Sequence, residues 1–162
     1  MNVAIVYEDL EMGKRASRVC HSVGHELGAA GELNQELWNF QLLDVAEIQE
    51  QAILATARAD LIVVATHGYE ELPLEVLLWI EGWVDKRNNR PGTLVALFDE
   101  LNPPADARAA TQSYLQYVAR RGGLNFLTPT SPTMQAQREW AFERVAAARA
   151  DPPNVLQGIS HE

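Results

Sequence analysis

Short apolar runs alternate along the chain with longer stretches in which apolar residues recur at every third or fourth position. Runs such as VAIVY and LIVVA are typical of buried β-strands, and the longer periodic stretches are typical of amphipathic helices. The strands predicted in this way span residues 3–7, 36–43, 61–65, 93–98 and 125–128. A helix is predicted after each strand, and the last helix runs from about residue 131 to about residue 150.

Five strand–helix units in one chain predict a single parallel sheet with helices on both faces, which is a three-layer α/β fold. The third run, LIVVA, is apolar on both faces, as a central parallel strand is. Right-handed crossovers leave few strand orders, and we expect the doubly wound, flavodoxin-like order 2-1-3-4-5. We expect one domain over residues 1–150 and a flexible tail over residues 151–162, which lack periodicity.

Ligands of doubly wound sheets bind outside the carboxyl ends of the strands, at the point where the strand order reverses. In the expected order, that point lies between the first and third strands, so the loops over residues 8–14 and 66–72 meet there. The side chains expected to line a pocket at this edge are Glu8, Asp9, Thr66, His67, Phe98, Asp99 and Thr128.

The chemistry of this edge leaves several alternatives open. A phosphate site needs small residues whose backbone amides approach the anion, whereas Glu8, Asp9 and Glu11 would repel it. Glu8 and Asp9 could instead hold Mg²⁺, which prefers carboxylates and water, or they could simply cap loops and helix ends. His67 could act as a base or could hydrogen-bond within its loop.

Composition narrows the classes of partner. The formal net charge of −9 repels a phosphate backbone, so we expect no nucleic-acid binding. No apolar run approaches the roughly 18 residues that span a bilayer, and we expect neither a signal peptide nor membrane attachment. The single cysteine, Cys20, suits a reducing cytoplasm.

The order of the units resembles a two-component receiver domain over most of the chain. The pair Glu8-Asp9 is similar to the acidic pair that holds Mg²⁺ in that family, and the runs PGTLVALFDE and NFLTP resemble its last two strands. The family's phosphate-accepting aspartate would fall at Ala65 or Thr66, which carry no carboxylate. Aspartyl phosphorylation needs that carboxylate. The resemblance therefore implies a non-catalytic signalling or protein-interaction module, with no cofactor except a possible Mg²⁺.

A second resemblance leads to a different function. The run ADLIVVATHG is similar to a strand of universal stress proteins, which often bind ATP, although the glycine-rich phosphate pattern of that family is missing. The alternative function is therefore a small-molecule or nucleotide binder, or a weak metal-dependent hydrolase, that uses the acidic loop and Thr66-His67-Gly68.

Apolar residues outside the expected core stripes suggest a protein partner or a homodimer. Leu74 and Leu78 lie opposite the core stripe of the third predicted helix, and Trp79 and Trp83 flank them. Exposed apolar patches mark interaction sites, and Trp is enriched in them, but the same residues could belong to a larger core. The residues expected on an interaction surface are Leu74, Leu78, Tyr114, Tyr117 and Trp140.

Overall fold

The computed structural model describes residues 1–26, 33–99 and 105–129, except for the side chains of residues 23–26. The expected fifth helix, the expected tail, Glu100 and Trp140 lie outside the described residues. The expected single domain over residues 1–150 and the flexible tail therefore stay predictions.

The centre of the fold is a five-stranded parallel sheet with the order β2-β1-β3-β4-β5. This order confirms the predicted flavodoxin-like α/β fold. The long apolar runs form the central strand, β3, and its two neighbours, β1 and β4. A strand covered by helices on both faces needs apolar side chains on both. The strands are β1 (Asn2–Tyr7), β2 (Asn34–Asn39), β3 (Leu61–Thr66), β4 (Thr93–Phe98) and β5 (Asn125–Leu127).

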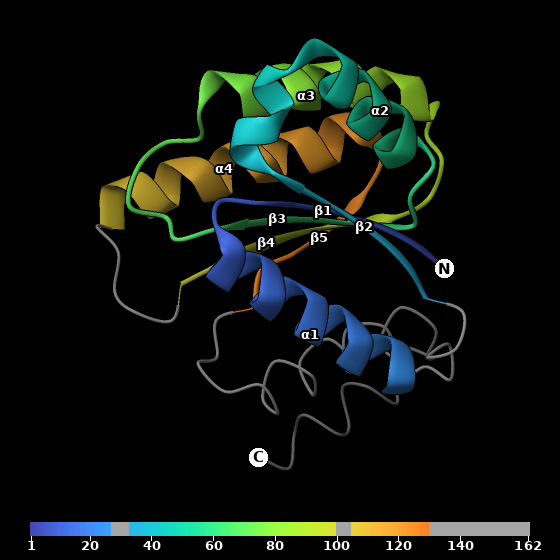
Figure 1. The fold of residues 1–162 in the computed structure, drawn as a ribbon, viewed down its shortest axis with the longest axis horizontal. Helices are drawn as coiled ribbons and strands as arrows, with labels where there is room; N and C mark the ends of the chain where they lie inside the picture. The colour runs from blue at the N-terminus through green and yellow to red at the C-terminus, as the bar shows by residue number, and fades with distance from the viewer. Residues whose placement is uncertain (27–32, 100–104, 130–162) are drawn as a thin grey trace, which may run out of the picture.

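Helices cover both faces of the sheet (Figure 1). One face carries α2 (Ala46–Ala57), α3 (Leu74–Val84) and α4 (Ala105–Gly122), and the other carries α1 (Leu10–Glu26). Two short 3₁₀ helices, η2 (Phe40–Asp44) and η3 (Asp85–Arg87), precede α2 and follow α3. None of the helices in the described ranges is both long enough and apolar enough to cross a membrane.

Two element boundaries differ from the predicted ones for local reasons. The second strand ends at Asn39, whose side-chain oxygen accepts the Gln41 N–H at 2.8 Å and starts η2. In η2 the apolar residues Phe40 and Leu43 turn inward at a spacing of three. The periodicity predicts a first helix that begins at Gly13, but α1 begins at Leu10, because Asp9 caps it.

Trp79 and Trp83 belong to the core and not to the surface. Both side chains are fully buried, and their rings meet edge to face with centroids 5.7 Å apart. Of the two alternatives left open for these tryptophans, the larger core is therefore the correct one. Leu74 and Leu78 are exposed, but their role in an interaction stays a prediction.

Candidate functional site

The carboxyl edge of the sheet brings together acidic residues from two loops and one histidine. β1, β3 and β4 run in register, with Tyr7 opposite Ala65 and Thr66 opposite Phe98. The residues that follow these strands therefore leave the sheet side by side, and side-chain hydrogen bonds join them into a cluster. The cluster consists of Glu8, Asp9, Thr66, His67, Tyr69 and Asp99.

His67 lies between two carboxylates. Its Nε2 is 2.6 Å from Asp9 Oδ2, and its Nδ1 is hydrogen-bonded to Asp99 Oδ2. Partial burial lowers the pKa of His67, but the hydrogen bonds to Asp99 and Asp9 outweigh burial, so the pKa is raised above its ordinary value. Carboxylates only accept hydrogen bonds, so a ring bonded to one at each nitrogen carries both protons. Asp9 and Asp99 therefore hold His67 in its protonated, cationic form, and neither ring nitrogen is free to act as a base.

Asp9 is the ionised partner of this cation and also the cap of α1. Its Oδ1 accepts the Met12 N–H at 3.1 Å, while Oδ2 contacts His67. Burial raises the pKa of Asp9, but the hydrogen bonds from Met12 and His67 outweigh burial and lower the pKa below its ordinary value. A carboxylate at a helix N-terminus is also stabilised by the helix dipole.

Glu8 joins the loop after β1 to the loop after β3. Its Oε1 accepts hydrogen bonds from Thr66 Oγ1 at 2.7 Å and from the His67 N–H at 2.8 Å. Thr66 Oγ1 in turn accepts the Gly68 N–H at 3.2 Å. Gly68 has a φ of 85°, a conformation that favours glycine. Glu8 thus shapes the loop that carries His67, and the expected Glu8–Asp9 metal pair stays a prediction.

Tyr69 belongs to the cluster, although the sequence alone did not mark it as a candidate. Its ring stacks on His67 with centroids 5.6 Å apart and an interplanar angle of 11°. Its hydroxyl lies 3.5 Å from Asp99 Oδ2, and the residue is 44% exposed. The sequence does contain one sign of its role, because Tyr69 is an aromatic residue in the loop after β3, at the point where the strand order reverses.

The other two expected pocket residues lie outside the cluster. Phe98 is buried, its carbonyl accepts a hydrogen bond from Arg15, and the Arg108 guanidinium lies 4.8 Å above its ring centroid. Thr128 Oγ1 is buried and makes no hydrogen bond within the described part of the chain. The two arginines place positive charge at the carboxyl end of β4, next to Asp99 in sequence.

A cation could also contact the exposed side of this edge. Asp9, Glu11 and His67 each offer one ligand atom, and these atoms lie within 4.8 Å of one another. A metal ion here would have to displace the proton on the histidine nitrogen, so its binding would weaken as the pH falls.

The described residues do not fit the phosphate of a nucleotide or flavin at the usual place. Such a phosphate rests on free amides at the N-terminus of the first helix. Here Asp9 already accepts the Met12 N–H with its side chain and the Gly13 N–H with its carbonyl. A Cβ atom at Gly13 would lie 2.9 Å from the Tyr7 ring, so this glycine is needed for packing against Tyr7.

No protein-family model matches the chain, and no curated protein is similar to it in sequence. Solved structures are similar in fold. An oxidoreductase from Corynebacterium diphtheriae has a TM-score of 0.59 and 14% identity, over 87% of this chain and 93% of that one. An azoreductase from Bacillus anthracis str. Sterne has a TM-score of 0.50 and 11% identity, over 86% and 95%. A Trp repressor binding protein from Bacillus subtilis has a TM-score of 0.46 and 11% identity, over 78% and 80%.

These neighbours correct three expectations. The resemblance to receiver domains is wrong, because the similar structures are named an oxidoreductase and an azoreductase. The non-catalytic signalling function was implied by that resemblance and is wrong with it. The expectation of no cofactor is also corrected, since electron transfer in enzymes with such names relies on cofactors. At 14% and 11% identity, what the likeness establishes for this chain is the flavodoxin-like fold.

Proposed function

We propose that the protein binds a planar small molecule, uncharged or cationic, at the carboxyl edge of its sheet. The ligand would be of the kind that oxidoreductases of this fold hold as a cofactor or reduce as a substrate. The observation that carries the proposal is the Tyr69 ring, which is stacked on His67 and partly open to solvent. This stacked pair lies where doubly wound folds bind their ligands.

The stacked pair suits a planar ligand because it is held in place. Both ring nitrogens of His67 are bonded to carboxylates, which fixes the orientation of the imidazole under Tyr69. An aromatic surface that is already ordered loses little conformational entropy when a ring stacks on it.

The charge of the loop after β1 argues against an anionic ligand at the N-terminus of α1. Glu8, Asp9 and Glu11 surround the helix N-terminus, and the only positive partner bonded to Asp9 in the described structure is His67. The names of two structural neighbours make a flavin ring the first ligand to test. The acidic loop favours riboflavin, which has no phosphate, over flavin mononucleotide (FMN), which carries one.

The test is a titration of riboflavin with the protein, followed by flavin fluorescence. We expect saturable quenching for the wild type and for Tyr69→Phe, which keeps the ring. Tyr69→Ala should weaken binding by about two-fold to ten-fold, since an aromatic pair contributes about 0.5–1.5 kcal/mol. Equal affinity of Tyr69→Ala and the wild type would overturn the proposed role of this ring, and a wild type that binds no riboflavin would overturn the choice of ligand.

A further inference from the structure

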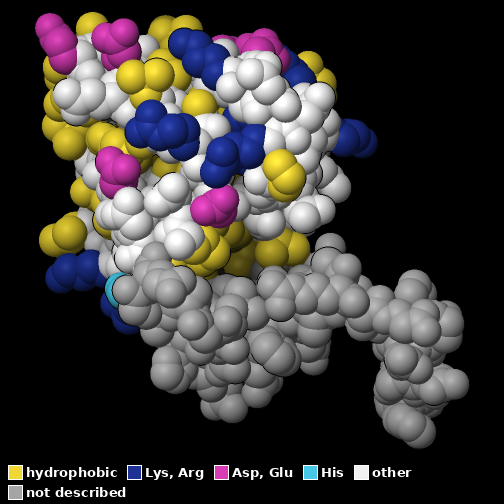
Figure 2. Space-filling view, turned by 90° about the vertical axis from the view of Figure 1, so that its right-hand side faces the viewer, with side chains coloured by type: hydrophobic (Ala, Val, Ile, Leu, Met, Phe, Trp, Pro, Cys, Tyr) yellow, Lys and Arg dark blue, Asp and Glu magenta, His cyan; other side chains and the backbone are white. Residues whose placement is uncertain are grey.

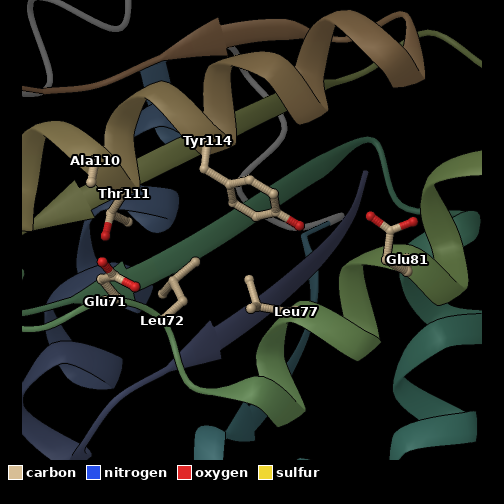
Figure 3. A pocket seen from close by; sticks show the side chains of 7 residues that line it. All are labelled: Glu71, Leu72, Leu77, Glu81, Ala110, Thr111 and Tyr114. Atoms are coloured by element: carbon tan, nitrogen blue, oxygen red, sulfur yellow. The ribbon is translucent and has the colours of Figure 1, made fainter.

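A separate pocket lies between α3 and α4 (Figure 3). These helices cover the face of the sheet opposite α1 (Figure 1). Its volume is about 440 Å³, which suits a small organic molecule. The residues that line it are Glu71, Leu72, Leu77, Glu81, Ala110, Thr111 and Tyr114. None of them belongs to the His67 cluster.

The lining is apolar in the middle and polar at its ends. Figure 3 shows Leu72 and Leu77 between the two glutamates, with Thr111 at the same end as Glu71. Tyr114 reaches across from α4. A molecule with an apolar stem and one polar head matches this order.

Thr111 supplies an independent sign that something binds here. The residue is only 4% exposed, and its Oγ1 has no hydrogen-bond partner within the described ranges. A buried hydroxyl without a partner is costly, and such groups in native structures often await a ligand or water. Figure 3 shows this oxygen on the pocket side of α4, facing the end that Glu71 occupies.

The two glutamates differ in their partners. Glu81 is paired with Arg121, whose two terminal nitrogens lie 3.0 Å from its two carboxylate oxygens and which also bonds to Asp85. Glu71 is exposed at the mouth and has no ion pair among the described residues. One carboxylate of the pocket is therefore uncompensated, and an organic monocation would balance it.

We propose that this pocket binds a primary ammonium compound with a short aliphatic chain. The ammonium group would donate hydrogen bonds to the Glu71 carboxylate and to Thr111 Oγ1. The chain would lie along Leu72 and Leu77. An ammonium group has three donors and no acceptor, which fits a carboxylate and a free hydroxyl oxygen.

The test is calorimetric titration of the full chain with n-hexylammonium chloride. Hexanoate and 1-hexanol have the same chain length and serve as the ligand controls. We expect the ammonium compound to bind and Glu71→Gln to weaken it by about ten-fold, since the lost hydrogen bond joins two charged groups. Thr111→Val keeps the side-chain shape and should weaken binding several-fold. Glu70→Gln, which removes a neighbouring carboxylate outside the pocket, should bind as the wild type does.

Three results would overturn the proposal. The first is no binding of hexylammonium, and the second is equal binding of hexanoate. The third is unchanged affinity in Glu71→Gln when circular dichroism shows that this variant is folded. Riboflavin binding should be unaffected in Glu71→Gln, so the outcome here is separate from that at the carboxyl edge.

Discussion

At the scale of single residues, the main feature is a histidine whose charge is fixed by its neighbours. Asp9 and Asp99 come from different strand ends, and both contact the imidazole of His67. The arrangement keeps a positive charge beneath the Tyr69 ring while the surrounding loop is acidic. A planar ligand on Tyr69 would therefore meet a cation below the ring and carboxylates beside it.

His67→Gln should lower stability in a pH-dependent way. The pKa of His67 is raised in the folded state, so its stabilising contribution is complete below the ordinary histidine pKa of about 6.5. That contribution is lost as the pH rises through the raised folded pKa. The difference in unfolding free energy between the wild type and His67→Gln should thus be larger at pH 6 than at pH 9, as measured by urea denaturation. A difference that grows with pH would contradict a protonated His67 held by Asp9 and Asp99.

Asp9→Asn should show the opposite dependence at acid pH. The pKa of Asp9 is lowered in the folded state, so its contribution is present above the ordinary aspartate pKa of about 3.9 and is lost below it. The stability of the wild type should approach that of Asp9→Asn as the pH falls from 6 toward 3. Thermal unfolding of both proteins across this pH range measures the difference in their stability. A difference that stays constant would contradict the lowered pKa of Asp9.

The sequence predicted the members of this cluster better than their roles. Glu8, Asp9, Thr66, His67 and Asp99 could be placed at one edge because parallel strands end together. The direction of each side chain depends on loop geometry, which neither periodicity nor composition encodes. Two partners of His67 therefore went unrecognised, and Tyr69 was missed.

At the scale of secondary-structure elements, buried Arg87 joins the end of α2 to the turns beside β3 and β4. Its Nη1 donates to the carbonyls of Thr56 and Ala59, each at 2.9 Å, and its Nη2 donates to those of Arg90 and Pro91, each at 3.1 Å. The guanidinium thus bonds carbonyls at the C-terminus of a helix and in a turn. The positive charge also suits a helix C-terminus.

Arg87→Ala should cost about 3 kcal/mol of unfolding free energy, because it removes four hydrogen bonds to buried or partly buried carbonyls. Arg90→Ala is the matched control. Arg90 is exposed and lies 3.6 Å from Asp60, so its loss should cost no more than about 1 kcal/mol. Denaturant unfolding of both variants measures the costs, and similar values for the two would refute the joining role of Arg87.

The contact between α2 and α3 depends on a glycine. A Cβ atom at Gly82 would lie 2.3 Å from Ile53 Cδ1. Gly82→Ala should therefore destabilise the protein by about 1 kcal/mol, since overpacking outweighs the gain in helix propensity. Adding Ile53→Val removes Cδ1, the nearer of the two clashing carbons, and leaves Cγ1 at 2.8 Å. The double variant should therefore be more stable than the sum of the single effects predicts, by about 1 kcal/mol. Strict additivity in this double-mutant cycle would argue against the contact.

At the scale of the whole molecule, charge is distributed unevenly. The net charge is −9, yet Figure 2 shows Lys and Arg side chains gathered on the face near the amino ends of the strands. Arg58, Lys86 and Arg90, which precede β3 and β4, are exposed there. The carboxyl edge instead carries the acidic loop after β1. The acidic loop after β1 and these exposed basic residues therefore lie at opposite ends of the sheet.

The fold could be predicted from sequence, but the family resemblance could not be trusted. Apolar runs of strand length and right-handed crossovers restrict the topology to very few choices. The order 2-1-3-4-5 is, however, shared by proteins with unrelated chemistry, so it cannot identify a function. The acidic pair Glu8-Asp9 looked like a receiver's metal site, yet Glu8 bonds to Thr66 and His67, and Asp9 caps α1.

The most direct test of the central claim compares the affinities for riboflavin and FMN at several salt concentrations. The two molecules share one ring system and differ only in a phosphate, so the ratio of their affinities measures the effect of the phosphate on binding. We predict that at about 0.01 M salt FMN binds at least about ten-fold more weakly, and that the ratio narrows toward one as salt screens the acidic loop. Tighter binding of FMN than of riboflavin at low salt would contradict a carboxyl edge without a phosphate site.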